Sequence, residues 1–224
     1  MKTLTELADH YGSDKGLTIE QGHGYTLLYE DLLEPFRLKE ITFLEIGLKK
    51  GGPECGGTSW AYRGDSPSVE MWLEYFPKID LVGFDISDFS SQQKKHEKFA
   101  FLMGDLGNSE DLKKLSSLRD YYDIILDDAS HASDHQQMAL SFLWDKIPSG
   151  GLYIIEDLHW QPWAHDAIPK TLDLFHNYFN KEKDYKYSPL ISRELIDKIY
   201  TEAAYMLLHQ SPKSGGQTLI LKKI

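Results

Sequence analysis

The sequence predicts an α/β fold with a mostly parallel sheet of seven strands, helices on both faces and an antiparallel hairpin at the C-terminus. Two observations predict it. From residue 41 to residue 158, short β-branched and apolar runs alternate with amphipathic helical patterns, as in a parallel sheet covered on both sides. Near the C-terminus two apolar runs flank a Gly-Gly turn, which indicates an antiparallel hairpin.

The elements follow in order along the chain. Residues 1–40 carry two helical patterns, the first stopped by the turn residues at 12–16 and the second spanning 25–38. Parallel strands are expected at 41–47, 79–87, 99–105, 121–131 and 152–158, and hairpin strands at 203–210 and 218–224. Helices are expected at 66–76, within 87–97, at 108–119, 135–147, within 159–180 and at 190–203. We expect one structural domain, in which an N-terminal helical lid segment (1–40) precedes the main body (41–224).

Composition excludes several classes of protein. The 224 residues carry 24 Lys and Arg against 35 Asp and Glu, a formal net charge of −11, which disfavours a nucleic-acid binder. Cys55 is the only cysteine, so an intramolecular disulfide framework and a CxxC zinc site are excluded. No apolar run reaches the roughly 20 residues that cross a bilayer, and no secretory signal begins the sequence. We expect a cytoplasmic protein that binds neither nucleic acid nor membranes.

Carboxylates follow all five expected parallel strands. In an open parallel sheet ligands bind at the carboxyl ends of the strands, so these side chains are expected at one edge. A single Asp or Glu there is explained by capping of the next helix, but five in succession favour a ligand site. The residues are Glu45, Asp85, Asp105, Asp127, Asp128, Glu156 and Asp157.

The first half of this edge favours S-adenosylmethionine (SAM) over a dinucleotide. The glycine-rich loop after the first strand, with Gly47 and Gly51, lets backbone amides approach a ligand, but it lacks the G-x-G-x-x-G fingerprint. Asp85 can accept hydrogen bonds from a ribose diol, and Asp105 can accept one from an adenine amine. Glu45 beside the loop would balance a sulfonium better than a pyrophosphate.

The second half indicates a cation site and a general base. Asp128, Glu156 and Asp157, with Asp127, offer the oxygen ligands that Mg²⁺ prefers. His131 lies three residues past Asp128, where an imidazole can remove a proton near neutral pH.

Eight motifs in order resemble a family of class I SAM-dependent O-methyltransferases, which includes the macrocin- and mycinamicin-type sugar O-methyltransferases. The O-methyltransferase domains of polyketide synthases are related to this family. The motifs are YGSDKG (11–16), H-x-Y (23–25), FLEIG (43–47), MWLEYFP (71–77), GFDIS (83–87), GD (104–105), YDIILDDASH (122–131) and GGLYIIEDL (150–158).

The resemblance implies a Rossmann-like methyltransferase domain at 41–224 and a role for each matching residue. His131 is implied as the base, and Asp128, Glu156 and Asp157 as Mg²⁺ ligands. The implied acceptor is a hydroxyl of a sugar or polyketide, free or carrier-bound, and a homo-oligomer is compatible with it. The SAM site is expected to use Tyr11, Ser13, Lys15, Glu45, Gly47, Gly51, Asp85, Asp105 and Asp127.

Three alternatives stay open at this point. A polyketide-pathway enzyme would use a metal-free dyad of His131 and Glu156. A non-catalytic SAM-binding scaffold module would bind the cofactor without transferring its methyl group. An NAD(P)-linked oxidoreductase would need a phosphate-binding fingerprint that this sequence lacks.

Overall fold

The computed structural model describes residues 1–18, 20, 22–49, 65–162, 168–180 and 188–224. Seven strands form one sheet in the order β3-β2-β1-β4-β5-β7-β6. They are β1 (Ile41–Ile46), β2 (Ile79–Asp85), β3 (Phe99–Met103), β4 (Ile124–Asp127), β5 (Leu152–Ile155), β6 (Ala203–Gln210) and β7 (Gln217–Lys223). Strands β1 to β5 pair in parallel, and β7 pairs antiparallel with both β5 and β6. The predicted fold class and its C-terminal hairpin are confirmed.

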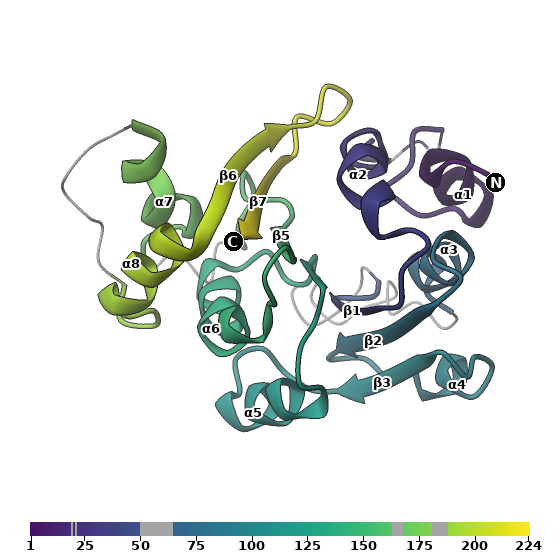
Figure 1. The fold of residues 1–224 in the computed structure, drawn as a ribbon, viewed down its shortest axis with the longest axis horizontal. Helices are drawn as coiled ribbons and strands as arrows, with labels where there is room; N and C mark the ends of the chain where they lie inside the picture. Colours follow the sequence, from purple (N-terminus) through teal and green to yellow (C-terminus); the bar gives the residue numbers. More distant parts are fainter. Residues whose placement is uncertain (19, 21, 50–64, 163–167, 181–187) are drawn as a thin grey trace.

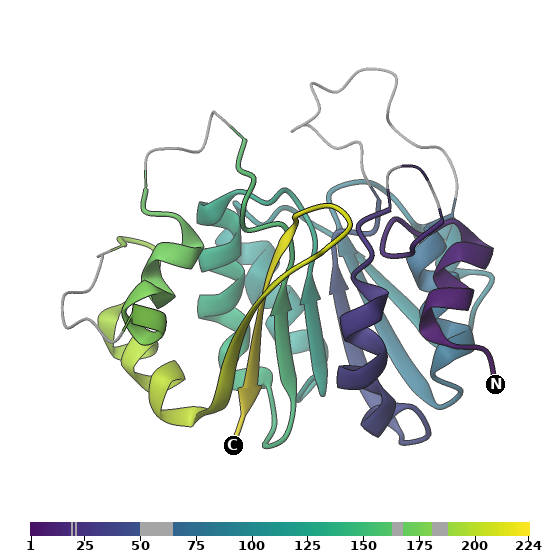
Figure 2. The same cartoon turned by 90° about the horizontal axis from the view of Figure 1, so that it is seen from above.

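Helices cover both faces of this sheet. Figure 1 shows α1, α2 and α3 grouped on one side and α6, α7 and α8 on the other, and Figure 2 shows the sheet between these groups. The helices are α1 (Leu4–Tyr11), α2 (Thr26–Leu33), η1 (Glu34–Phe36), α3 (Pro67–Tyr75), α4 (Ser90–Gln93), α5 (Ser109–Leu118), α6 (Ser133–Leu143), η3 (Trp144–Lys146), α7 (Thr171–Asn180) and α8 (Arg193–Glu202). None of these helices is long and apolar enough to span a membrane.

The strand alternation divides the core into two clusters. In β1, Phe43 packs in the cluster that holds α1, α2 and α3, whereas Leu44 and Ile46 pack in the cluster that holds α5 to α8. Tyr153 of β5 faces the second cluster in the same way. Alternate residues along a strand therefore face different groups of helices. The same alternation applies to the acids at the ends of the strands.

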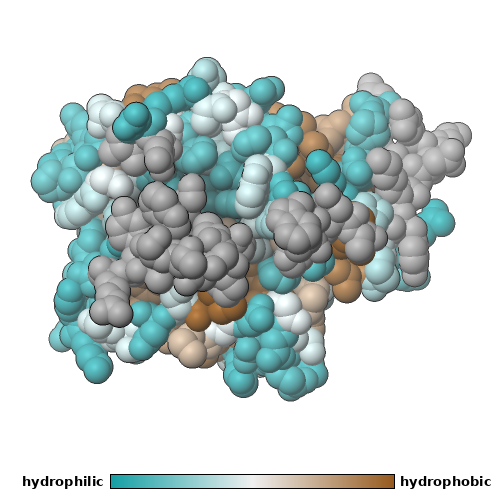
Figure 3. All heavy atoms as spheres, turned by 180° about the vertical axis from the view of Figure 1, so that it is seen from behind, coloured by the Kyte–Doolittle hydropathy of each residue, from teal (hydrophilic) through white to brown (hydrophobic). Residues whose placement is uncertain are grey.

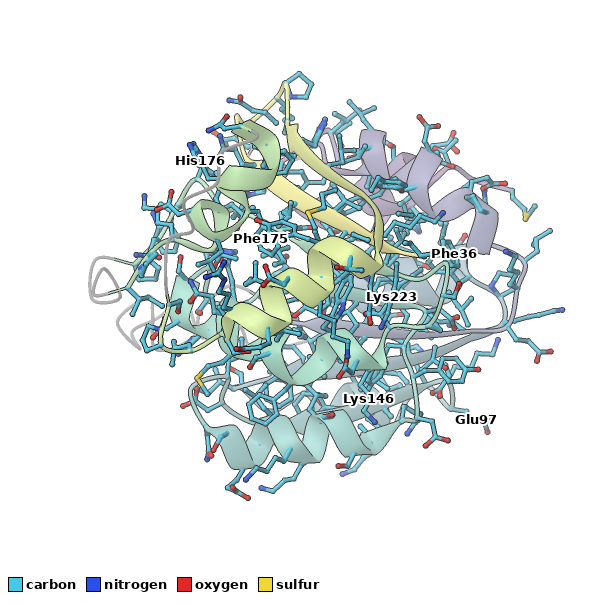
Figure 4. The ribbon with its side chains drawn as sticks, turned by 60° about the vertical axis from the view of Figure 1, so that its left-hand side comes forward. Phe36, Glu97, Lys146, Phe175, His176 and Lys223 are labelled. Atoms are coloured by element: carbon cyan, nitrogen blue, oxygen red, sulfur yellow. The ribbon has the colours of Figure 1, made fainter. Side chains whose placement is uncertain are left out.

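On the side formed by α6, α7 and α8, each face of a helix likewise has its own surroundings. Figure 4 looks onto this side, where Phe175 of α7 points into the core and the neighbouring His176 points away from it. Phe175 is fully buried, so α7 covers the sheet with one apolar face and leaves the other face polar.

Two local predictions needed adjustment. The fourth strand was expected at 121–131 but β4 is four residues long, because the chain leaves the sheet after Asp127 to form a loop. The helix expected at 66–76 is α3, which begins at Pro67, and the hydroxyl of Ser66 before it makes no capping bond. It donates instead to the carbonyl of Leu48 at 2.7 Å, which ties the start of α3 to the end of β1.

The N-terminal helices are part of the packed fold. Leu4 and Leu7 of α1 and Tyr29 of α2 are buried in the same cluster as Phe43 and Trp72. Between α1 and α2 the chain runs to the edge where the parallel strands end, and the β6–β7 turn meets it there (Figure 2). The hydroxyls of Ser211 and Ser214 both donate to the carbonyl of His23 in this loop.

Candidate functional site

Three potential metal ligands converge at the ends of β4 and β5. One ligand atom from each of Asp128, His131 and Asp157 lies within 4.8 Å of the other two. Asp128 and Asp157 follow the strands, and His131 lies on the loop that leads to α6. Figure 3 views the molecule from the side toward which the parallel strands run, and hydrophilic residues predominate on this face. The structure thus brings together three of the residues that the sequence marked as base and metal ligands.

The backbone is strained at two members of this trio. His131 and Asp157 have positive φ angles of 59° and 55°, a region that residues other than glycine seldom adopt. Gly47 supports the arrangement from β1, because a Cβ at this position would lie 2.3 Å from the carbonyl oxygen of Asp128. The loops after β1 and β4 therefore touch backbone to backbone, and only glycine fits at position 47.

Lys15 enters the acid cluster from the N-terminal segment. Its side chain is 2% exposed, and its ammonium contacts the carboxylate of Asp128 and lies 3.0 Å from Glu156 Oε2. Burial by itself lowers the pKa of the Lys15 ammonium, but the carboxylates of Asp128 and Glu156 outweigh burial and hold it well above its usual value. Lys15 therefore carries its positive charge inside the cluster.

Two tyrosines that the sequence did not single out also bind these acids. The Tyr29 hydroxyl donates to Glu156 Oε1 at 2.6 Å, and the Tyr25 hydroxyl donates to Asp157. The turn between β6 and β7 packs directly against this contact, because a Cβ on Gly216 would lie 2.0 Å from the Tyr25 hydroxyl oxygen. The H-x-Y motif at 23–25 was the only sequence signal for Tyr25, and apolar helical spacing alone places Tyr29 in the core.

The acids at the ends of β2 and β3 accept hydrogen bonds from backbone amides. Asp85 accepts hydrogen bonds from the backbone amides of Leu48 and Ser87, both at 2.7 Å. Asp105 accepts one from the amide of Gly107 at 2.8 Å. Ile86 and Met103, which lie next to these acids, are 42% and 60% exposed. Exposed apolar side chains beside fixed carboxylates are suited to a ligand with a flat apolar part and hydroxyl groups.

Glu45 and Asp127 are buried and lie outside the trio. Glu45 faces α3, where its two oxygens accept hydrogen bonds from Ser68 Oγ at 2.9 Å and Trp72 Nε1 at 3.1 Å. Burial raises the pKa of Glu45 and that of Asp127, each to about 7. Asp127 lies on the opposite face of the sheet, and within the described chain its Oδ2 atom has no hydrogen-bond partner.

The remaining predicted site residues have structural contacts. The Tyr11 hydroxyl donates to Glu74 of α3 at 2.6 Å, which directs it away from the acid cluster. Ser13 is buried, and its hydroxyl accepts a hydrogen bond from the amide of Lys15 at 3.4 Å. Gly51 lies outside the described residues.

Comparison with known proteins identifies relatives of one kind. No family model matches the chain. An 8-demethyl-8-alpha-L-rhamnosyl tetracenomycin-C 2'-O-methyltransferase from Streptomyces olivaceus is 35% identical over 177 residues, which cover 75% of this chain and 42% of that protein. A demethylmacrocin O-methyltransferase from Streptomyces fradiae is 30% identical over 177 residues, which cover 76% of this chain and 41% of that protein. The chain thus spans less than half the length of these relatives.

Solved structures agree with this relationship. The MycE methyltransferase from the mycinamycin biosynthetic pathway, in complex with Mg, SAH and mycinamycin VI, superimposes with a TM-score of 0.73 at 22% identity. The superposition covers 99% of this chain and 53% of MycE. A second MycE structure, with Mg and SAH, gives a TM-score of 0.71 at 20% identity, with 99% and 55% covered. The chain is therefore a relative of the macrocin- and mycinamicin-type O-methyltransferases, and it has the Rossmann-like fold of a class I methyltransferase.

Proposed function

We propose that the protein is a SAM-dependent O-methyltransferase that methylates a hydroxyl group of a glycosylated or polyketide-like small molecule. One observation carries the proposal: Asp128, His131 and Asp157 converge within 4.8 Å in a chain 35% identical to a sugar O-methyltransferase. The trio lies at the carboxyl ends of parallel strands, where open α/β sheets bind their ligands.

The donor set at this place fits a divalent cation. Asp128 and Asp157 supply carboxylate oxygens, and within the described chain the buried Nδ1 atom of His131 has no hydrogen-bond partner. In this arrangement Asp128 and Asp157 would hold Mg²⁺. Glu156, which the resemblance implies as a third ligand, here accepts hydrogen bonds from Lys15 and Tyr29.

His131 is the base that the geometry favours. When bound, SAM supplies the electrophilic methyl group and Mg²⁺ supplies positive charge beside the acceptor oxygen. An alcohol loses its proton reluctantly at neutral pH, because its pKa lies near that of bulk water. The imidazole of His131 would take that proton, and the carboxylate of Asp157, 3.7 Å from His131 Nε2, would stabilise the resulting positive charge.

The contacts of Glu156 argue against the metal-free dyad. A dyad needs Glu156 to orient His131, yet both Glu156 oxygens accept hydrogen bonds from residues of the N-terminal segment. The carboxylate beside His131 is that of Asp157. We therefore favour the pairing of His131 with Asp157 over the dyad.

The β2–β3 side is our proposed SAM site. Asp85 accepts hydrogen bonds from the backbone amides of Leu48 and Ser87, which fix its carboxylate at the end of β2, and a carboxylate there can accept hydrogen bonds from a ribose diol. Ile86 and Met103 would then flank the adenine, and Asp105 would accept a hydrogen bond from its amine.

The test has a binding step and a transfer step. S-adenosylhomocysteine (SAH) should bind to the protein in isothermal titration calorimetry, and Asp85→Ala should weaken this binding about tenfold or more, because the ribose loses its acceptor. SAM with a labelled methyl group should then transfer label to an oxygen of at least one glycoside in a panel that includes mycinamycin VI and demethylmacrocin. SAH binding without transfer to any acceptor would favour the scaffold alternative, and binding of NAD(P)H in place of SAH would favour the oxidoreductase.

A further inference from the structure

Lys15 occupies the place of a cation in the acid cluster. Its buried ammonium contacts Asp128 and Glu156, two of the three carboxylates that the family resemblance assigns to Mg²⁺. The third, Asp157, receives its hydrogen bond from the neutral hydroxyl of Tyr25. Positive charge from the protein itself is therefore concentrated on one side of the proposed metal site.

The backbone around Lys15 is held by hydrogen bonds within the N-terminal segment. The carbonyl of Lys15 accepts a hydrogen bond from the amide of Thr26 at 3.0 Å, and the amide of Gly16 donates to the carbonyl of Ser13 at 3.0 Å. Asp9 Oδ1 accepts from the amide of Leu17 at 2.7 Å. These bonds fix the direction in which the Lys15 side chain leaves the backbone, toward Asp128 and Glu156.

A divalent cation and an ammonium repel each other when they share carboxylates away from water. Mg²⁺ also needs lone pairs on its oxygen ligands, and each hydrogen bond from Lys15 uses one of them. We propose that the Lys15 ammonium and a divalent cation compete for the carboxylate of Asp128, so that Lys15 sets the metal affinity of the site. The inference rests on the metal site of the proposed function and does not depend on methyl transfer.

The experiment measures Mn²⁺ binding by electron paramagnetic resonance, because free and bound Mn²⁺ differ in signal and Mn²⁺ takes the same oxygen ligands as Mg²⁺. Lys15→Met, which removes the charge and keeps an unbranched stem, should bind Mn²⁺ about tenfold more tightly or better than wild type. Lys15→Arg keeps the charge and should bind no more tightly than wild type. Lys113→Met is the matched control, because Lys113 pairs with Glu110 on an exposed face of α5 and its loss changes the net charge equally.

Lys15→Gln covers the case in which Lys15→Met does not fold, because the amide can still donate hydrogen bonds to Asp128 and Glu156. Thermal unfolding gives a second readout: Mn²⁺ should stabilise the neutral variants more than it stabilises wild type. Wild-type affinity or weaker binding in both neutral variants would overturn the inference and leave the metal site standing. If no variant binds Mn²⁺, the inference and the metal site both fail, whereas SAH binding still tests the methyltransferase proposal separately.

Discussion

The acids at the ends of β2 and β3 and the acids at the ends of β4 and β5 occupy the same edge of the sheet but have different kinds of partner. Asp85 and Asp105 accept hydrogen bonds from backbone amides, mostly within two residues of themselves. Asp128, Glu156 and Asp157 are bound by side chains of Lys15, Tyr25 and Tyr29, which lie 113 to 141 residues away in sequence.

This difference separates a preformed site from an assembled one. Backbone amides are neutral donors whose positions follow from the fold of the main chain, and they orient the carboxylates on the β2–β3 side. The β4–β5 side buries several carboxylates together, and it needs a buried cation and two hydroxyls from another part of the chain. We expect substitutions on the β4–β5 side to affect chemistry and stability together, and those on the β2–β3 side to affect mainly cofactor binding.

The largest effect should come from the proposed base. His131→Ala should lower turnover about 10²- to 10⁴-fold, because a positioned base contributes that much to proton transfer. SAH affinity should stay near wild type, since the β2–β3 side is untouched. Turnover is measured with labelled SAM, and His176→Ala, which removes a histidine that points away from the core, is the control. Near-native turnover in His131→Ala would remove this residue from the mechanism.

A glycine substitution tests how tightly the loop after β1 packs against the loop after β4. Gly47→Ala places a Cβ 2.3 Å from the Asp128 carbonyl at a φ of 83°, and it should lower the free energy of unfolding by about 3 kcal/mol or more. Gly150→Ala is the matched control, with a φ of 83° and no atom within 4 Å of the added Cβ. It should cost about 1 kcal/mol, so the difference between the two in urea unfolding isolates the close contact. Equal losses would mean that the β4 loop moves aside easily.

Glu45 gives a pH-dependent prediction. Because burial raises its pKa to about 7 from 4.5, the folded protein keeps a proton that the unfolded chain loses between these pH values, and stability falls as pH rises through this window. Glu45→Gln should therefore be more stable than wild type at pH 8 by up to about 3 kcal/mol, and this advantage should disappear below pH 4.5. Urea unfolding at several pH values measures the difference, and a difference that does not change with pH would contradict the assigned cause.

The smallest effect concerns a single hydroxyl. Tyr29→Phe removes a donor from the buried Glu156 and should lower the free energy of unfolding by about 1–2 kcal/mol. Tyr121→Phe, at an exposed tyrosine, should change it by less than about 0.5 kcal/mol. If both variants unfold alike at pH 7, the long-range bonds to the β4–β5 acids contribute little to stability.

The parts of this structure that could be predicted from the sequence are those that depend on local sequence patterns. The sheet class, the hairpin and the placement of acids after each strand depend on neighbouring residues, and all appear as expected. The direction of Glu45 follows from alternation along β1, which places it on the same face as Phe43 and beside α3. The expectation that Glu45 balances a sulfonium depends on its position along the strand, and it stays a prediction.

The partners of the β4–β5 acids could not be predicted in this way. Nothing near Asp128 or Glu156 in sequence indicates that Lys15 lies between them, because the contact depends on how α1 and α2 pack on the sheet. The same applies to Gly216, whose neighbour Tyr25 precedes it by most of the chain. The expectation that Lys15 contributes to the SAM site stays a prediction, and the structure adds that its ammonium contacts Asp128 and Glu156.

The contact between the N-terminal loop and the β6–β7 turn has a consequence for the order of folding. Ser211 bonds to His23 and Lys213 to Leu17, across 188 and 196 residues of chain. During synthesis the segment that carries Lys15 and Tyr25 emerges before the strands of the sheet, whereas the hairpin that holds it emerges after β5. The β1–β2–β3 side can pair while translation continues, but the β4–β5 side stays incomplete until the hairpin has joined the sheet. A nascent chain that lacks the hairpin is therefore expected to have an incomplete acid cluster.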